Sequence, residues 1–201
     1  MKVTYEKKFK PIIVGIDRQL SDVPHLHNEI EVIYVEKGNA LAYADHSCYK
    51  LQDGDIFISF PNQIHYYNGS ELGSYYIMIF SADLIYGQKT LLNSSIPESN
   101  ILEKTAELAA VIKEINGCFA SGRETECVGY LNIFMGRLLS GVKLIPALAT
   151  DNSTLRKILD YCSENFSDEL SLNSVSEQLH LSKYYISHLL NRKLSLGFND
   201  Y

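Results

Sequence analysis

The chain has 201 residues, 46% of them hydrophobic and 21% charged, and 18 basic residues stand against 24 acidic ones for a formal charge of -6. This composition is that of an ordinary globular protein, so it excludes a disordered, collagen-like or low-complexity chain. The acidic balance also excludes a globally basic nucleic-acid binder. Any contact with DNA must therefore come from a local patch.

The N-terminus and the cysteines indicate a reducing compartment. Residues 1–6 lack the apolar core of a signal peptide, and runs such as Tyr75 to Phe80 are too short to cross a bilayer. The four cysteines show no CxxC spacing and are interpreted as free or buried thiols: Cys48, Cys118, Cys127 and Cys162. We expect a cytoplasmic protein that makes no contact with a membrane.

Residues 1–97 are predicted to be all-β. Short runs rich in β-branched and aromatic residues alternate with Gly, Asn and Pro turns, which indicates an antiparallel barrel or sandwich. The runs are Ile12 to Ile16, Ile30 to Val35, Ala40 to Ala44, Ile56 to Phe60, Ile64 to Tyr67 and Tyr75 to Phe80. The fold class expected for the whole chain is α+β and multidomain, with this barrel first.

Residues 98–141 change to a helical period. Apolar side chains recur at steps of three and four, and Asn116-Gly117 is predicted to end the first helix. The positions are Ile101, Leu102, Thr105, Leu108, Ala109, Ile112 and Ile115. A second helix is predicted from Glu124 to Ser140, so the pair forms an αα-hairpin. Its apolar stripes would pack on the barrel or form a dimer interface, and the pattern leaves both open.

After a predicted linker at 142–153, residues 154–201 fit three short helices. Ser171 or Asn173 can cap the second helix and Ser182 the third, because their oxygens can accept from free N–H groups of the first turn. The short break at His180 to Ser182 forces the last two helices to cross. That geometry is a helix-turn-helix, whose second helix can enter a major groove.

The outer face of the last helix carries the local patch that DNA binding requires. Residues 183–193 contain three basic residues and no acidic one. Ser, His and Asn can hydrogen-bond base edges, whereas Lys and Arg suit phosphates. The candidate DNA-binding residues are Ser182, Lys183, Tyr184, Ser187, His188, Asn191, Arg192 and Lys193. A helical hairpin with an ordinary solvated face would show a similar pattern.

Residues 154–201 resemble the start of the DNA-binding region of AraC-type transcription regulators. The resemblance rests on Leu170-Ser171-Leu172, on Leu181-Ser182, on the run from Tyr185 to Leu190 and on Phe198 to Tyr201. Regulators of this family carry a cupin-like β-barrel, a helical dimerisation hairpin, a linker and two helix-turn-helix units. The resemblance implies a homodimer that binds operator half-sites under control of a small-molecule effector held in the barrel.

Two departures from the family pattern modify this expectation. Ser195 stands where the family usually has Gly, which would alter the turn after the recognition helix. The chain also ends at Tyr201, where the family continues into a second helix-turn-helix. We therefore expect this chain, as a truncated regulator, to bind operator DNA weakly or not at all.

A second constellation lies in the predicted barrel. His25, His27 and Glu31 would share one face of a strand, and His65 follows a later turn. The spacing resembles the two cupin motifs, H-x-H-x3-E with Gly38 after it, and a glycine, Pro61 and His65. Three imidazoles and one carboxylate could hold Fe, Mn, Ni or Zn. The alternative is a metal-free ligand pocket or a satisfied polar core.

The pocket walls follow from strand parity. Ile33 and Val35 share the face of Glu31, Ile30, Val32 and Tyr34 lie on the other face, and Tyr67 shares the face of His65. The 14 tyrosines would suit a sugar or an aromatic effector, although tyrosines also populate strands for their β preference. The candidate ligand-binding residues are His25, His27, Glu31, His65 and Tyr67.

The competing function is a metal-dependent cupin enzyme, such as a dioxygenase or an isomerase, built on the same histidines. An enzyme would not need the C-terminal region, and the sequence contains no Ser/His/Asp motif, P-loop or GxGxxG. We therefore assign no catalytic residue and expect no enzyme. His46 lies in a predicted exposed turn and receives no role.

Overall fold

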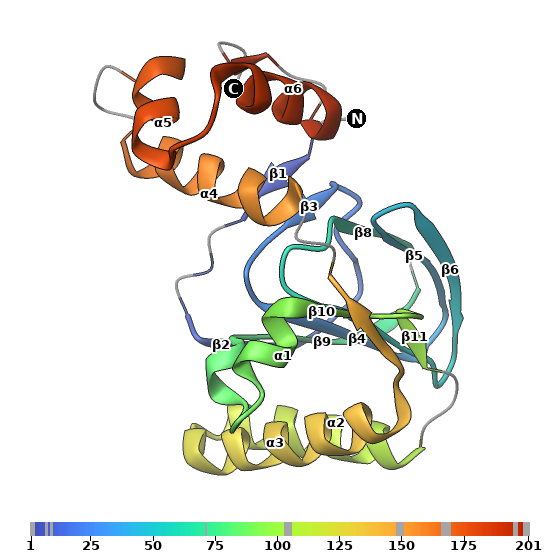
Figure 1. Ribbon diagram of the computed structural model, residues 1–201. Helices are drawn as coiled ribbons and strands as arrows, with labels where there is room; N and C mark the ends of the chain where they lie inside the picture. Colours follow the sequence, from blue (N-terminus) through green and yellow to red (C-terminus); the bar gives the residue numbers. More distant parts are fainter. Residues whose placement is uncertain are drawn as a thin grey trace.

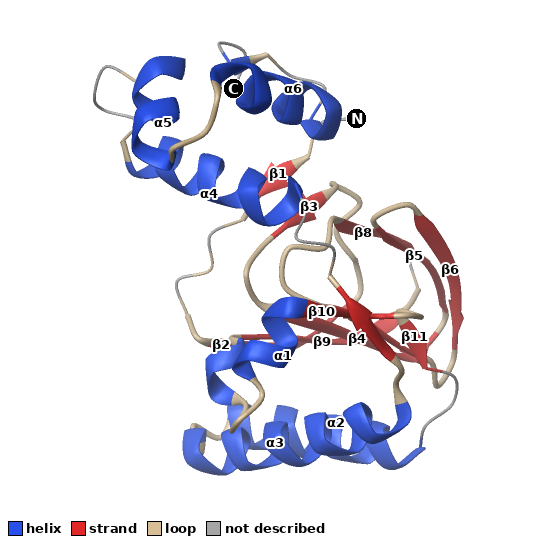
Figure 2. Ribbon diagram, in the orientation of Figure 1, coloured by secondary structure: helices blue, strands red, loops and turns tan. Residues whose placement is uncertain are grey.

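The computed structural model describes residues 3–6, 8, 10–70, 72–102, 106–147, 151–165, 170–194 and 197–198. Two five-stranded sheets pack against each other in the middle of the molecule (Figure 1). Helices cover the lower sheet on its outer side, and a second group of helices forms a lobe on the other side of the molecule, beside one edge of the upper sheet (Figure 2). The α+β architecture with an antiparallel β-sandwich agrees with the sequence.

The first sheet has the order β1-β3-β8-β5-β6, and the second has the order β11-β7-β4-β9-β2. The bounds of the first are Thr4–Tyr5, His25–Leu26, His65–Gly69, Asn39–Ala44 and Ser47–Gln52. Those of the second are Ile101–Leu102, Ile56–Ser59, Ile30–Lys37, Ser74–Phe80 and Ile12–Asp17. Only β1 and β3 pair in parallel among these strands. The sheets stay separate, so the expected barrel is a two-sheet sandwich.

The alternation of side chains along β4 determines which of its residues face the site. Ile33 and Val35 face the core between the sheets together with Phe57 and Tyr67. The alternate side chains of the strand, at Ile30, Val32 and Tyr34, face the helices on the other side. Both faces are therefore buried, as the continuous apolar run indicates. Glu31 shares the inner face and is buried there despite its charge.

The hairpin consists of α2 (Ala106–Ala120) and α3 (Glu124–Gly141). The prediction that Ile101 and Leu102 belong to the first helix is wrong, because they pair with the edge of β7 as β11. The predicted stop at Asn116-Gly117 is also wrong. The helix continues because Cys118 extends its buried face, which offsets the roughly 1 kcal/mol cost of a helical glycine. Thr105 lies outside the described residues.

Shorter elements connect these parts. A 3-10 turn at Ala82–Leu84 and α1 (Lys89–Ser94) lead to β10 (Ser95–Pro97). Strand β12 (Leu144–Pro146) pairs with β10 in the segment expected to be a linker, and α4 already begins at Asp151. None of the described helices is long and apolar enough to span a membrane.

The C-terminal lobe contains α4 (Asp151–Glu164), α5 (Leu172–Leu179) and α6 (Lys183–Leu194). Ser171 caps α5 in a capping box with Ser174, so it is the cap instead of Asn173. The Ser182 hydroxyl accepts from the backbone N–H of Tyr185 at 3.1 Å. The helices enclose Leu155, Ile158, Val175, Ile186 and Leu189. Ser195 and Asn199 to Tyr201, which enter the family comparison, lie outside the described residues.

Candidate functional site

The four residues predicted to bind a metal converge between the two sheets. His25 in β3 stands directly opposite His65 in β8, and Glu31 comes from β4 of the facing sheet. His27 lies between β3 and β4, so it reaches the site from a connection and not from a continuous strand. One ligand atom of each residue lies within 4.8 Å of all the others, and all four are buried.

Glu31 is the meeting point of the cluster. Its Oε2 lies 3.0 Å from His27 Nε2, 3.4 Å from His65 Nε2 and 3.9 Å from His25 Nε2. The Tyr67 hydroxyl donates to the other oxygen, Oε1, at 2.9 Å. One carboxylate thus contacts every residue that the sequence assigned to the ligand pocket.

Backbone carbonyls fix the orientation of the three imidazoles. His25 Nδ1 lies 2.8 Å from the carbonyl of Val23, and the corresponding distances are 3.2 Å from His27 to Glu29 and 2.9 Å from His65 to Gln63. A carbonyl can only accept, so Nδ1 carries the proton in each contact. In the neutral rings, every Nε2 then turns a lone pair toward the carboxylate.

Lone pairs that face a carboxylate repel it unless a proton or a cation lies between them. His65 Nε2 is buried and has no hydrogen-bond partner among the described residues. Imidazoles held through Nδ1 with Nε2 pointing at a common centre are typical of metal ligands. The donor set and its orientation therefore fit a divalent ion.

The electrostatics of the cluster favour one negative and one positive member. Burial alone would raise the pKa of Glu31, but the charge of His65 and the contacts with the three imidazoles hold this pKa well below its usual range. Burial opposes the charging of His25, yet Glu31 raises the pKa of His25 overall. Burial lowers the pKa of His27. Of His25 and His27, His25 is therefore the more readily protonated.

A cavity of about 170 Å³ opens beside the cluster. Its lining includes His25, Glu31 and Tyr67, so a molecule in it would touch the cluster directly. The rest of its lining combines apolar and polar side chains: Leu20, Ile33, Ile77 and Ile79, then Glu6, Lys8, Asp17, Gln19 and Ser21. This lining suits a small molecule that has both polar groups and an apolar face.

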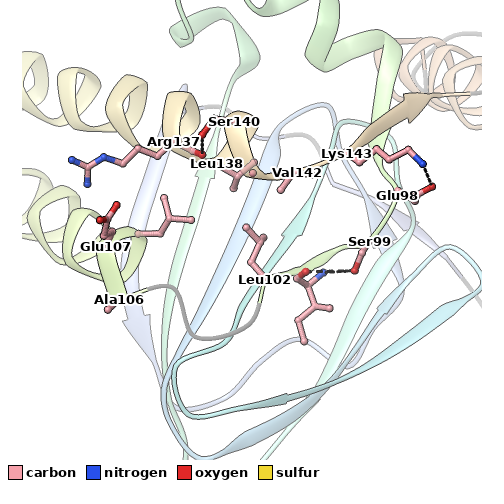
Figure 3. Close-up of a pocket in the computed structure, with 13 residues that line it drawn as sticks. Glu98, Ser99, Leu102, Ala106, Glu107, Arg137, Leu138, Ser140, Val142 and Lys143 are labelled. Atoms are coloured by element: carbon pink, nitrogen blue, oxygen red, sulfur yellow. Dashed lines mark hydrogen bonds and ion pairs between the residues drawn. The ribbon is translucent and has the colours of Figure 1, made fainter.

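A larger cavity, of about 590 Å³, lies between β11 and the hairpin (Figure 3). Leu102, Leu138 and Val142 form part of its wall, and the Lys143 ammonium pairs with Glu98 at 2.7 Å on its rim. It contains none of the predicted site residues. The sequence carried no signal for it, because its walls come from several elements and share no motif.

The predicted DNA-binding residues share the surface of α6 and the turn before it. Ser182, Lys183, Tyr184, His188, Asn191 and Arg192 are exposed, whereas Ser187 and Lys193 are half-buried. The rings of Tyr184 and His188 stack at 6.0 Å with an interplanar angle of 5°. Burial lowers the pKa of Lys193 and nearby Asp45 opposes this effect, so the end of α6 lies near the β5–β6 turn.

Comparisons with known proteins agree with this architecture. A family model for the AraC-like ligand binding domain matches residues 12–127. A search of curated protein sequences returned no significant match. The crystal structure of ToxT from Vibrio cholerae bound to an unsaturated fatty acid has 12% identity and a TM-score of 0.64, over 97% of this chain and 78% of ToxT.

A second ToxT structure, bound to (E)-4-(8-methylnaphthalen-1-yl)but-3-enoic acid, has 13% identity and a TM-score of 0.65, over 95% of this chain and 79% of ToxT. At this identity the likeness shows the shared fold. The family model carries the assignment, because it spans more than half of the chain. The protein therefore belongs to the family of AraC-like ligand-binding domains and contains the sensor domain of an AraC-type regulator.

Proposed function

We propose that this protein is a ligand-responsive, DNA-binding transcription regulator that works as a homodimer. Residues 1–97 would sense the effector, 98–141 would dimerise, 142–153 would connect, and 154–201 would bind operator DNA. The observation that supports the proposal is the exposed face of α6, the second helix of the α5–α6 pair, where polar and basic side chains lie together. The same chain holds a cavity whose lining includes Glu31 of the family-matched domain.

The face of α6 divides into two kinds of contact. Lys183, Arg192 and Lys193 suit phosphates, which supply affinity and a dependence on salt. The polar side chains of Ser182, Tyr184, Ser187, His188 and Asn191 suit base edges, and an Asn amide can bind adenine with two hydrogen bonds. Changes of the two kinds should therefore have different effects on sequence preference.

The test is selection from a random duplex library, followed by fluorescence anisotropy over a series of salt concentrations, on a chain extended by the second helix-turn-helix unit that the family carries. Asn191→Ala should relax preference at one base pair by about 1–3 kcal/mol, whereas Lys183→Ala should weaken all sequences and reduce the salt slope by about one. Asn68→Ala, at an exposed position on β8, is the matched control and should change neither. Identical sequence preferences for Asn191→Ala and Lys183→Ala would contradict the assigned roles.

For the effector, we propose a small polar molecule such as a sugar. Hydroxyl groups could bond Glu31, His25 and the Tyr67 hydroxyl, while a sugar's C–H face could lie on the isoleucines. The ToxT structures hold a fatty acid and an aryl butenoic acid. The cavity here is small and its lining includes several charged side chains, which favours a compact polar effector over a long acyl chain.

A divalent ion at the cluster is a second candidate, because His65 Nε2 is buried and no described residue forms a hydrogen bond with it. His25, His27, Glu31 and His65 would hold Fe, Mn, Ni or Zn, and the ion would act as a Lewis acid toward an effector oxygen. The family consists of ligand-binding domains of regulators, which argues against an enzyme at this site.

Elemental analysis tests the metal candidate on protein purified without chelators or a metal affinity column. We expect about one ion per chain, and loss of the ion in Glu31→Gln, because that substitution removes the anionic ligand. His46→Asn changes an exposed histidine outside the cluster and should leave the metal content unchanged. A metal-free protein that still binds its effector would assign the cluster to direct ligand binding.

A further inference from the structure

Two short segments of the sensor face the cluster on one side and the C-terminal lobe on the other. In β3, His25 points into the cluster, whereas Leu26 is fully buried in the hydrophobic core shared with the lobe. Beside it, His65, the first residue of β8, points into the cluster, and Ile64, just before β8, packs against the same shared core. In both places one peptide bond joins a histidine of the cluster to a residue of the shared core.

The shared core joins the two lobes. Val3 and Leu26 from the sensor lie in it with Leu155, Ile158 and Leu190 from the helices. Tyr5 pairs with Leu26 in the β1–β3 ladder and packs against the same core. Figure 1 shows α4 lying beside β1 and β3, at the edge of the first sheet. A displacement of β3 would therefore act on the core that it shares with α4.

Polar contacts follow the same route. Arg156 of α4 donates from Nη1 to Oδ1 of Asn28, the residue after His27. Glu29 Oε2 lies 3.5 Å from His27 Nδ1. Burial raises the pKa of Glu29, and the charges of Lys8 and Arg156 oppose this rise. The connection that carries His27 into the cluster thus also holds α4.

We propose that β3 and the Ile64-His65 step transmit the state of the cluster directly to α4 and α6, with Leu26, Ile64 and Asn28 as the transmitting residues. The inference rests on the proposed role of the cluster as the ligand site. A ligand that moves His25 and His65 moves the two apolar side chains with them, since tightly packed interfaces shift as units. The coupling is reciprocal, so the docked helices also affect affinity at the cluster.

Hydrogen exchange read by mass spectrometry tests this in the full chain, with Zn²⁺ as the probe ion after treatment with a chelator. Binding of Zn²⁺ should change the exchange rates of amides in α4 and α6 by about fivefold or more, the lower range of typical allosteric coupling. The amides of α2 and α3, which pack on the other sheet, should change by less than about twofold, because they lie outside this route.

Leu26→Ala removes the main apolar contact and leaves all four cluster residues in place. It should abolish the Zn²⁺ response of α4 and α6 and shift Zn²⁺ affinity, measured by calorimetry, by about fivefold or more. Leu51→Ala is the matched control, because Leu51 is equally buried but lies in the core between the sheets. It should keep the response. If Leu26→Ala does not fold, the half-buried Ile64→Ala takes its place.

Bound Zn²⁺ that leaves exchange in α4 and α6 unchanged would overturn the proposed transmission. If Zn²⁺ does not bind, the metal candidate fails separately, and Glu31→Gln becomes the perturbation of the cluster. Altered exchange in α4 and α6 of that variant would then support transmission, and wild-type rates would overturn it. Tyr67→Phe replaces Glu31→Gln if the latter does not fold. The DNA selection is an independent measurement, so its outcome tests the regulator function alone.

Discussion

Glu31 is the residue on which the sensor site depends. Its two oxygens contact four other side chains, one of which is Tyr67 through Oε1. A buried carboxylate is costly unless charges and hydrogen bonds compensate it. The histidines face Oε2, whereas Oε1 accepts a hydrogen bond from the tyrosine hydroxyl. The two oxygens are therefore stabilised in different ways, and separate substitutions can test each of them.

Tyr67→Phe should lower the free energy of unfolding by about 1–3 kcal/mol, because it leaves a buried charged acceptor unpaired. Urea unfolding in the presence of a chelator measures this without a contribution from bound metal. Tyr49→Phe is the control: the Tyr49 hydroxyl donates to Asn100 Oδ1 at 3.3 Å, a contact that is neutral and only part-buried. That loss should stay below about 1 kcal/mol, and equal losses would contradict the special role of the Glu31 contact.

Most of the residues in the cluster could be predicted from spacing, and the groups that orient them could not. The spacing of His25, His27 and Glu31 indicated convergence, and parity placed Tyr67 with them. The orienting groups include the backbone carbonyls of Val23 and Gln63. Every residue has a carbonyl, so no residue type marks such a position. Ser59, whose hydroxyl lies 3.0 Å from His65 Nδ1, was missed for a similar reason, because serine is common in strands.

At the scale of elements, long periodic segments were predictable and short ones were not. The run over 124–140 gave α3 to within a residue, and the capping residues located α5 and α6. Strands β1, β3 and β11 have two residues each, too few to show any period. Pairing with a neighbour decides their conformation. That is why Ile101 and Leu102, which fit a helical step, extend along β7 instead.

Strand β6 was not predicted from the sequence, for a different reason. Its six residues are mostly exposed at the edge of the first sheet, so the strand lacks the apolar alternation that marks a half-buried one. Tyr49 and Leu51 alone indicate an inner face. The consequence for the site is small, because β6 lies far from β3 in the strand order. The short β3, by contrast, carries His25 and contacts the lobe.

At the scale of the whole molecule, the hairpin exposes an apolar residue on one surface. Ile133 of α3 is 46% exposed, and Gly129 and Gly136, one turn before and after it, have open space around them. Glycines inside a helix cost about 1 kcal/mol each relative to alanine. Close approach of a second copy of α3 would compensate this cost, which agrees with the proposed dimerisation through 98–141.

Ile133→Lys should therefore shift a dimer toward monomer, raising the dissociation constant by about tenfold or more, because a charge would be buried at the centre of the contact. Sedimentation equilibrium over a range of concentrations measures the change. Leu72→Lys makes the same chemical change at a site that is 90% exposed in the turn before β9, and should leave assembly unchanged. Equal weakening by both variants would place the dimer contact elsewhere. Because two half-sites require two copies of α6, the monomeric variant should also lose most of its affinity for a paired operator while retaining its affinity for a single half-site.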